Sequence, residues 1–188
     1  MPKRITEDQI LEATIEVLLE RGYASATTRH IAQRADMSEV TLFRRFGNKA
    51  KLTIAAVTHA VEKESYSPEY TGDVEHDLLQ VLTFFQRQKH SRQTSLMPLI
   101  LTEVPRFPEL QEALEAPFAR ISGVGQLLVR YQQEGVLKEE HPLHAVAALT
   151  GPLIILKLLG DANPHRDIPD LELKSFIQAF LSGHRKSN

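Results

Sequence analysis

Apolar residues recur every three or four positions along the first quarter of the chain, a spacing typical of short amphipathic helices. The pattern predicts three helices there, over residues 6–22, 27–35 and 38–46. The first begins with the capping-box sequence Thr6-Glu7-Asp8-Gln9, and Gly22 is a typical helix stop. Because only the turn at Asp36-Met37 separates the second helix from the third, the segment has the pattern of a helix-turn-helix.

The rest of the chain repeats the helical pattern over longer segments. We expect helices over residues 49–64, 73–90, 93–104, 109–134, 142–159 and 171–183. Pro98 and Pro117 fall inside two of them, and each is expected to remove a helical hydrogen bond and bend its helix. No stretch alternates apolar and polar residues over the length of a strand, so the predicted fold class is all-α.

The composition is that of a globular protein without disulfides. Of the 188 residues, 42% are hydrophobic, which is too high a share for a disordered chain. The absence of cysteine excludes disulfides, thiolate metal sites and cysteine nucleophiles. The charged start of the sequence lacks the apolar segment of a secretory signal, so we expect a cytoplasmic protein.

Charge is distributed unevenly along the chain. The net charge is only −2, yet residues 21–52 hold seven basic residues against the two acidic residues Asp36 and Glu39. The seven are Arg21, Arg29, Arg34, Arg44, Arg45, Lys49 and Lys51. A compact basic patch indicates a polyanion-binding module, although surface charges also cluster by chance.

The helix over residues 38–46 has the character of a DNA-recognition helix. Leu42 and Phe46 are spaced to face inward. The outward positions are Glu39, Val40, Arg44 and Arg45. Such a helix fits the major groove, and the residue types of Thr28, Thr41, Arg45 and Lys49 are those that bind phosphates beside it. The alternative is a small amphipathic helix whose polar face is merely solvated.

The sequence itself resembles the DNA-binding domain of TetR-type regulators over nearly all of residues 5–55. The resemblance is carried by ILEAT at residues 10–14, RGYASATT at 21–28, TTRHIA at 27–32 and TLFRRFGNKAKL at 41–52. It implies a homodimeric transcription regulator, most often a repressor, that binds palindromic double-stranded operator DNA. The DNA-binding residues that follow from the pattern and the resemblance are Thr28, Arg29, Ser38, Glu39, Val40, Thr41, Phe43, Arg44, Arg45 and Lys49.

Two positions depart from the family pattern. Phe43 stands where the family usually has tyrosine, so a phosphate-binding hydroxyl is missing, and the charge of Arg45 could replace that contact. Asp36 stands where glycine is usual, at a position expected to need a positive φ. Aspartate tolerates that conformation better than most residues, so we expect a small cost and the same fold.

The resemblance divides the chain into a helix-turn-helix domain over residues 1–52 and a helical effector-binding and dimerisation domain over residues 53–188. The segment TEVPRFPEL at residues 102–110 is similar to one found in a broad branch of these regulators. The expected effector is a small hydrophobic or amphipathic molecule. Its predicted pocket consists of Phe84, Phe85, Met97, Phe107 and Phe118. A ligand there would act on DNA by tilting the helix over residues 49–64, which is expected to join the two domains.

The last two helices are expected to pair with those of a second copy, as in the family. The predicted interface residues are Leu149, Leu153, Phe176, Ile177 and Phe180. The apolar run from Val146 to Leu159 is shorter than a membrane span and contains Lys157, so it is interpreted as a helix buried on both sides.

Other classes of function are poorly supported. His141-x-x-His144 and His59-x-x-Glu62 could each supply two metal ligands, but no third is evident, so we expect no metal and no cofactor. No serine lies in a nucleophile-elbow sequence, and an enzyme is not expected. Two alternatives remain open: a helical enzyme or binding module that reuses this scaffold, and a regulator controlled by a protein partner.

Overall fold

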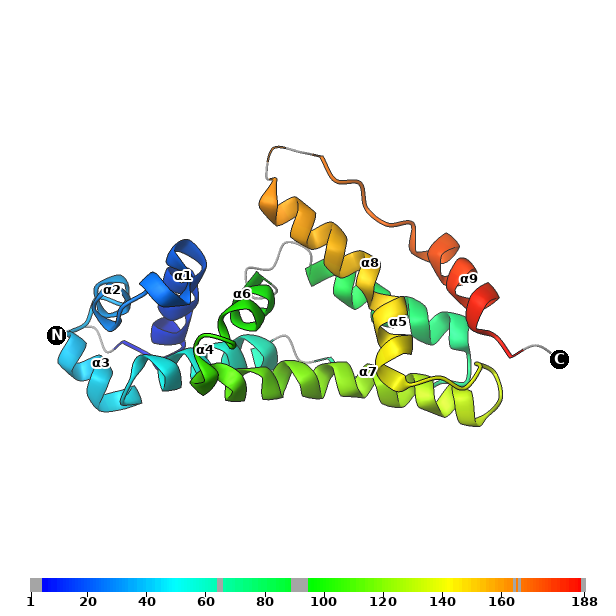
Figure 1. Cartoon of the computed structure of the whole chain (residues 1–188), viewed down its shortest axis with the longest axis horizontal. Helices are drawn as coiled ribbons and strands as arrows, with labels where there is room; N and C mark the ends of the chain where they lie inside the picture. Colours follow the sequence, from blue (N-terminus) through cyan, green and yellow to red (C-terminus); the bar gives the residue numbers. More distant parts are fainter. Residues whose placement is uncertain (1–4, 64–65, 89–94, 164, 166, 187–188) are drawn as a thin grey trace. The chain divides into compact units, whose positions relative to one another are not determined.

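The computed structural model describes residues 5–63, 66–88, 95–163, 165 and 167–186, and this part of the chain is predominantly helical (Figure 1). It forms nine α-helices and the 3-10 helix η3. They are α1 (Glu7–Ser25), α2 (Thr28–Arg34), α3 (Glu39–Phe46), α4 (Lys49–Lys63), α5 (Val74–Arg87), α6 (Leu96–Glu103), η3 (Pro108–Leu114), α7 (Glu115–Gln133), α8 (Pro142–Ala162) and α9 (Leu173–His184). The all-α fold class is confirmed; the predicted helix ends at Glu64, His90 and Gln93 lie outside the described residues.

The start of α1 is the predicted capping box. The Thr6 hydroxyl accepts the backbone N–H of Gln9 at 3.3 Å, and the Gln9 side chain accepts the backbone N–H of Thr6 at 3.0 Å. Gly22 interrupts the helix as expected, because its φ of 71° lies in the region that favours glycine. One further turn follows, so α1 ends at Ser25.

The turn between α2 and α3 also has the predicted conformation. Asp36 adopts a φ of 54°, a left-handed conformation that aspartate tolerates. The N–H of Met37 bonds to the Ala32 carbonyl at 3.0 Å, which closes the turn. The aspartate therefore occupies the glycine position without changing the fold.

The predicted helix over residues 109–134 is wrong over its first six residues, 109–114. The chain instead forms η3 and then begins α7 at Glu115. Leu110 and Ala113 are buried in η3, and a 3-10 helix places residues three apart on one side. Because α4 and α6 both pack against η3, tertiary contacts select the tighter helix where the apolar spacing allows either.

The predicted effect of Pro98 and Pro117 is also wrong. Each is the third residue of its helix, α6 or α7. The first four N–H groups of an α-helix have no partner within it, so proline removes no hydrogen bond there. Pro152 is the proline that lies inside a described helix, α8.

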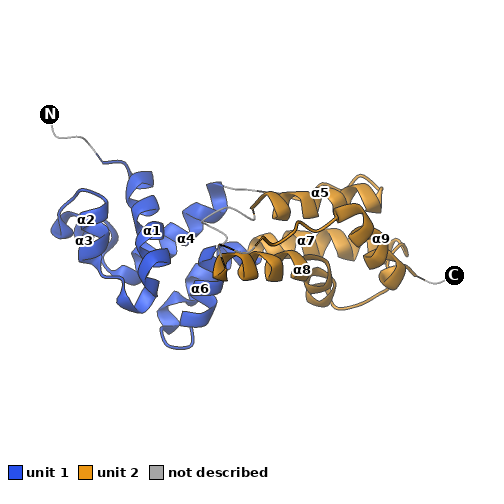
Figure 2. Ribbon diagram, turned by 90° about the horizontal axis from the view of Figure 1, so that it is seen from above, with its two compact units in different colours: residues 1–65, 92–118 blue, residues 66–91, 119–188 orange. Residues whose placement is uncertain are grey.

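The chain divides into two compact units, shown in different colours in Figure 2. Unit 1 comprises residues 1–65 and 92–118, and unit 2 comprises residues 66–91 and 119–188. In unit 1, α1 packs against α2, α4 and α6. Its core includes Ile10, Leu18, Ile31, Leu42, Leu52, Ile100 and Leu110. The helix-turn-helix thus shares its core with α4, α6 and η3.

In unit 2, α5 packs against α8 and α9 over a core that includes Leu78, Leu82, Val124, Leu128, Leu149 and Phe180. α8 is 21 residues long and, by length and composition alone, could cross a membrane. Only one side of α8 is buried in this core, so the expectation of burial on both sides does not hold for the single chain.

Candidate nucleic-acid interface

α3 is held on unit 1 by one buried face. Leu42 is 1% exposed and Phe46 packs against the same core, as predicted. At the helix start, the Ser38 hydroxyl accepts the N–H of Thr41 at 3.1 Å and lies 2.8 Å from the Thr41 hydroxyl. The buried face and the cap together fix which side of α3 points away from the core.

The opposite face of α3 is exposed and combines two apolar residues, Val40 and Phe43, with Arg44. Arg45 lies at the edge of this face and pairs with Glu7 of α1. Val40 is 79% exposed and Phe43 60% exposed, and Arg44 and Arg45 are exposed beside them. The predicted outward positions Val40, Arg44 and Arg45 are therefore outward in the structure. An exposed helix face that carries arginine is the kind of surface that enters the major groove of DNA.

Two of the predicted DNA-contacting polar residues bind each other. The Thr28 hydroxyl donates to the Glu39 carboxylate at 2.5 Å, which links the start of α2 to the start of α3. Glu39 is exposed, yet one of its oxygens is already engaged. The bond adds a polar link between α2 and α3 to the packing of Leu42 in the core.

The arginines of the basic patch differ in how far their charge is neutralised within the chain. Arg34 binds Glu16 at 2.8 Å and Glu20 at 2.6 Å, and Arg45 binds Glu7 at 3.1 Å. Among the described residues, neither Arg29 nor Arg44 has an ion-pair partner. Arg21 and Lys51 are likewise exposed without an ion-pair partner among those residues, and Arg44 is the one of these four basic residues that lies on α3.

Lys49 lies at the start of α4 and its ammonium group points into unit 1. Its Nζ donates to the carbonyls of Tyr23 at 2.8 Å and Ala26 at 3.0 Å, and it lies 4.0 Å from the centre of the Tyr23 ring. Burial lowers the pKa of Lys49, although Glu103 and Glu109 oppose this effect. The lysine therefore satisfies carbonyl groups at the end of α1 and keeps one N–H for another partner.

Tyr23 is a buried residue for which no role was predicted from the sequence. Its ring meets that of Phe107 edge to face, with centroids 4.9 Å apart. Burial, together with Glu109 and Glu103, raises the pKa of Tyr23 to about 12. Its position after the Gly22 kink carries no sequence signal of this role, because the contacts come from α4, α6 and η3.

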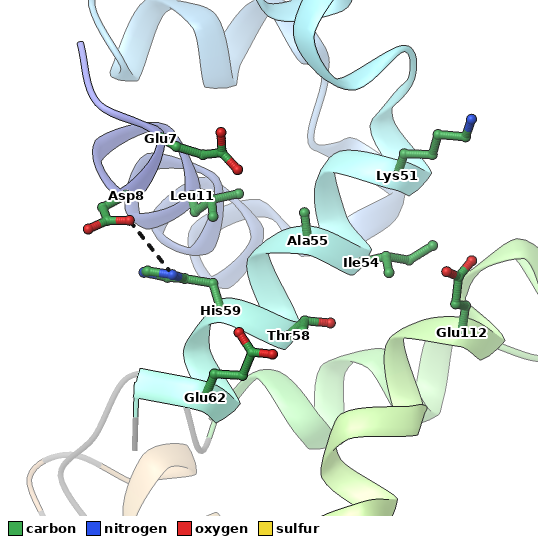
Figure 3. Close-up of a pocket in the computed structure, with 10 residues that line it drawn as sticks. All are labelled: Glu7, Asp8, Leu11, Lys51, Ile54, Ala55, Thr58, His59, Glu62 and Glu112. Atoms are coloured by element: carbon green, nitrogen blue, oxygen red, sulfur yellow. Dashed lines mark ion pairs between the residues drawn. The ribbon is translucent and has the colours of Figure 1, made fainter. Parts of the chain in front are cut away.

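An acidic groove lies on unit 1 between α1, α4 and η3 (Figure 3). Its volume is about 600 Å³. The lining includes Glu7, Asp8, Glu62 and Glu112 against Lys51 and His59, and Asp8 lies 3.9 Å from His59. Carboxylates repel phosphates, so this side of unit 1 is unsuited to DNA. None of the predicted pocket residues lines it.

The predicted pocket residues belong to two different units. Phe84 and Phe85 lie on α5 with ring centroids 5.6 Å apart, and Phe84 stacks on Tyr66 at 4.4 Å. In unit 1, Met97 and Phe107 pack against the core, and Phe118 is 50% exposed. The pocket thus remains a prediction, to which the structure adds Tyr66 as an aromatic neighbour on unit 2.

The predicted interface residues lie on α8 and α9. Leu149, Leu153, Ile177 and Phe180 are buried in the core of unit 2, and Phe176 is half-buried. The exposed large apolar residues of α8 are Leu143, Ile154, Ile155 and Leu159. A partner chain that covered this helix would meet these exposed side chains first.

The first histidine of each candidate metal-ligand pair, His141 or His59, lies beside other groups of its own unit. His141 caps α8 by accepting the N–H of Leu143 at 3.3 Å. His59 lies near Asp8 and Glu12 on α1. In the described part of the chain, no group of three or more metal-ligating side chains comes together.

Comparisons with known proteins agree with this geometry. The family described as bacterial regulatory proteins of the tetR family matches residues 10–56, which run from α1 into α4. An HTH-type transcriptional regulator of Mycobacterium bovis is 31% identical over 167 residues, which cover 86% of this chain and 80% of the relative. A DNA-binding transcriptional repressor TetR of Mycobacteroides abscessus is 26% identical over 180 residues, covering 87% of this chain and 90% of its own.

The fold is likewise shared with a solved structure. A TetR family transcriptional regulator from Vibrio parahaemolyticus superposes with a TM-score of 0.76 at 16% identity, over 96% of this chain and 99% of that one. Sequence identity across most of both chains, the matched helix-turn-helix and the exposed face of α3 lead to one conclusion. The chain belongs to the TetR family and is a DNA-binding transcriptional regulator, a class of proteins that are not enzymes.

Proposed function

We propose that the protein is a cytoplasmic repressor that binds a palindromic operator as a homodimer and leaves it when a small hydrophobic molecule binds. The exposed face of α3, with Val40, Phe43 and Arg44 projecting from a rigidly capped helix, is the observation that carries the proposal. The M. abscessus relative is named a repressor, which supports repression of transcription as the proposed effect of DNA binding.

The proposed DNA contacts fall into two groups. Arg44 and Arg29 meet bases or nearby phosphates, because they lie on the two helices of the helix-turn-helix, α3 and α2, and no ion pair among the described residues engages either charge. Arg45 and Lys49 also bind phosphate, although each already has a partner within the protein. Arg45 would exchange Glu7 for a phosphate, and Lys49 would offer its one remaining N–H. Thr28, Ser38, Glu39 and Thr41 chiefly orient α3 through their own hydrogen bonds.

The dimer is proposed to form along α8 and α9. The exposed apolar residues of α8 would become buried against a second copy, which is how a soluble protein removes such a face from water. Two-fold symmetry then imposes a palindromic operator with half-sites about one helical turn or slightly more apart.

The effector is proposed to bind near the aromatic cluster of unit 2. Tyr66, Phe84 and Phe85 offer ring faces and edges, and the Arg120 guanidinium lies 5.5 Å from the Phe84 ring centre. Such a cluster suits a largely apolar or aromatic molecule. Release from DNA requires the effector to favour one arrangement of the dimer; a 100-fold loss of operator affinity corresponds to about 2.7 kcal/mol of coupling.

A matched pair of arginine variants tests the proposed DNA surface. An operator is first selected from random duplexes, and its affinity for each variant is then measured at several salt concentrations. Arg44→Ala is expected to weaken binding by roughly 1–3 kcal/mol and to relax the preference at one position. Arg34→Ala removes the same charge from a side chain that Glu16 and Glu20 already neutralise, so its effect is expected to be much smaller. Equal losses in both variants would contradict the proposed surface.

A further inference from the structure

The face of α3 that points away from the core carries two apolar side chains, those of Val40 and Phe43. Val40 and Phe43 are three residues apart, so they lie on the same side of the helix. Val40 is 79% exposed and Phe43 60% exposed, although both occur in a segment rich in arginine. Neither side chain contributes to the buried core of unit 1, so the fold does not account for an apolar residue at either position.

The polar side chains around this pair each have a hydrogen-bond partner within unit 1. The Glu39 carboxylate accepts from Thr28, and the Ser38 and Thr41 hydroxyls bond to each other. A group already satisfied within the protein gains little by exchanging that partner for a base edge. Val40 and Phe43, by contrast, are apolar and have no hydrogen-bond partner to exchange, and Arg44 lies beside them on α3.

We propose that Val40 and Phe43 recognise the C5-methyl groups of thymines in the major groove. Thymine is the one unmodified base that presents a methyl group there. A cytosine in its place would press its N4 amino donor against an apolar side chain and leave that donor unsatisfied. Each operator half-site therefore contains at least two A·T pairs, one read by Val40 and one by Phe43. The inference rests on the proposed function, since it assumes that α3 enters the groove.

Replacement of thymine by deoxyuridine tests this assignment directly. Deoxyuridine keeps every hydrogen-bonding group of thymine and lacks only the methyl. The full-length protein is used to select an operator from random duplexes, and each thymine of the selected half-site is then replaced in turn. Affinities are measured for the wild type, Val40→Ala, Phe43→Ala and the control Leu101→Ala, an exposed apolar residue of α6 in the same unit.

The wild type and Leu101→Ala are expected to lose about fourfold in affinity for each methyl removed at a contacted position. Removal at the equivalent position of both half-sites is expected to cost about 15-fold. For Val40→Ala, replacement of thymine by deoxyuridine at one of these positions is expected to leave the affinity unchanged. For Phe43→Ala, the same is expected at a different position. Because both side chains are largely exposed, neither variant should unfold; thermal denaturation of each variant confirms this.

The outcomes separate the inference from the function on which it rests. If no sequence is enriched, the proposed function fails and the inference fails with it. If an operator is enriched but contains no thymine in its half-sites, or the wild type binds all deoxyuridine duplexes as tightly as the thymine ones, only the methyl recognition is wrong. Full deoxyuridine sensitivity in both alanine variants would likewise overturn the assignment.

Discussion

At the scale of single residues, Lys49 and Arg44 show how intramolecular partners decide what a basic side chain can do. Both belong to the basic patch of residues 21–52. Lys49 donates to two backbone carbonyls at the end of α1, whereas Arg44 is exposed and has no ion-pair partner among the described residues. Two of the three N–H groups of Lys49 are therefore used by the fold, whereas no ion pair of the described residues engages Arg44.

Lys49→Ala is therefore expected to reduce stability as well as DNA binding. It leaves the carbonyls of Tyr23 and Ala26 without their donor, which should cost roughly 1–3 kcal/mol of unfolding free energy. Lys51→Ala removes an equal charge from an exposed side chain two residues away and should change stability by less than about 0.5 kcal/mol. Urea denaturation of the two variants measures the difference. Equal stabilities would show that the bonds of Lys49 contribute nothing to the fold.

At the scale of elements, the segment before α5 is fixed by one buried carboxylate. Asp77 on α5 accepts the Tyr131 hydroxyl at 2.5 Å, the Thr71 hydroxyl at 2.6 Å and the Thr71 N–H at 2.9 Å. Burial acts to raise the pKa of Asp77, but these hydrogen bonds outweigh it and hold the pKa below its ordinary value of 3.8. The carboxylate joins the connecting segment and α7 to α5.

The lowered pKa fixes the sign of a pH effect on stability. A group whose pKa is lower in the folded state stabilises it above the unfolded-state pKa, and this stabilisation disappears as pH falls through the folded-state value. Asp77→Asn is expected to reduce the free energy of unfolding by about 1–3 kcal/mol at pH 7. The gap between the wild type and the variant should narrow as pH falls below about 4.

Denaturant unfolding at a series of pH values measures this gap. Glu139→Gln, at an exposed position of the same unit, serves as the control and should follow the wild type. A gap between Asp77→Asn and the wild type that stayed constant down to pH 3 would contradict the proposed contribution of the Asp77 charge.

At the scale of the whole molecule, α8 has two apolar faces with different partners. Leu149 is fully buried in unit 2, whereas Ile155 is 55% exposed on the same helix. In the proposed dimer the second face is covered by another copy. The mean hydropathy of α8, high enough for a membrane span, then reflects burial by unit 2 on one side and by a partner chain on the other.

Aspartate substitutions on the two faces should have different results. Ile155→Asp places a charge in the proposed interface, which should weaken dimerisation by roughly 3–5 kcal/mol and leave the monomer folded. Leu149→Asp places the charge in the core and should unfold the chain. Sedimentation velocity and circular dichroism distinguish the two outcomes, with Gln126→Asp on α7 as an exposed control. A folded dimer in Ile155→Asp would place the interface elsewhere.

Much of unit 1 was predictable from the sequence because its signals are local. The capping box at Thr6 and the Ser38 cap each depend on residues within four positions, and the positive φ at Asp36 was expected from the glycine usual at that position in the family. The spacing of Leu42 and Phe46 likewise decides which face of α3 is buried. The helix-turn-helix, and with it the family resemblance, follows from such short-range patterns.

What the sequence left open was decided by contacts between distant segments. Helical periodicity is shared by α- and 3-10 helices, so the sequence did not show that residues 109–114 form η3, packed on α4 and α6, and that the α-helix starts only at Glu115. Charge along the chain does not reveal that Lys49 meets the carbonyl of Tyr23, 26 residues away, or that Glu7 neutralises Arg45. The sequence by itself determined most of the helices and the class of protein. Tertiary structure decided which side chains remain exposed for DNA, because burial and ion pairing depend on residues far apart in the chain.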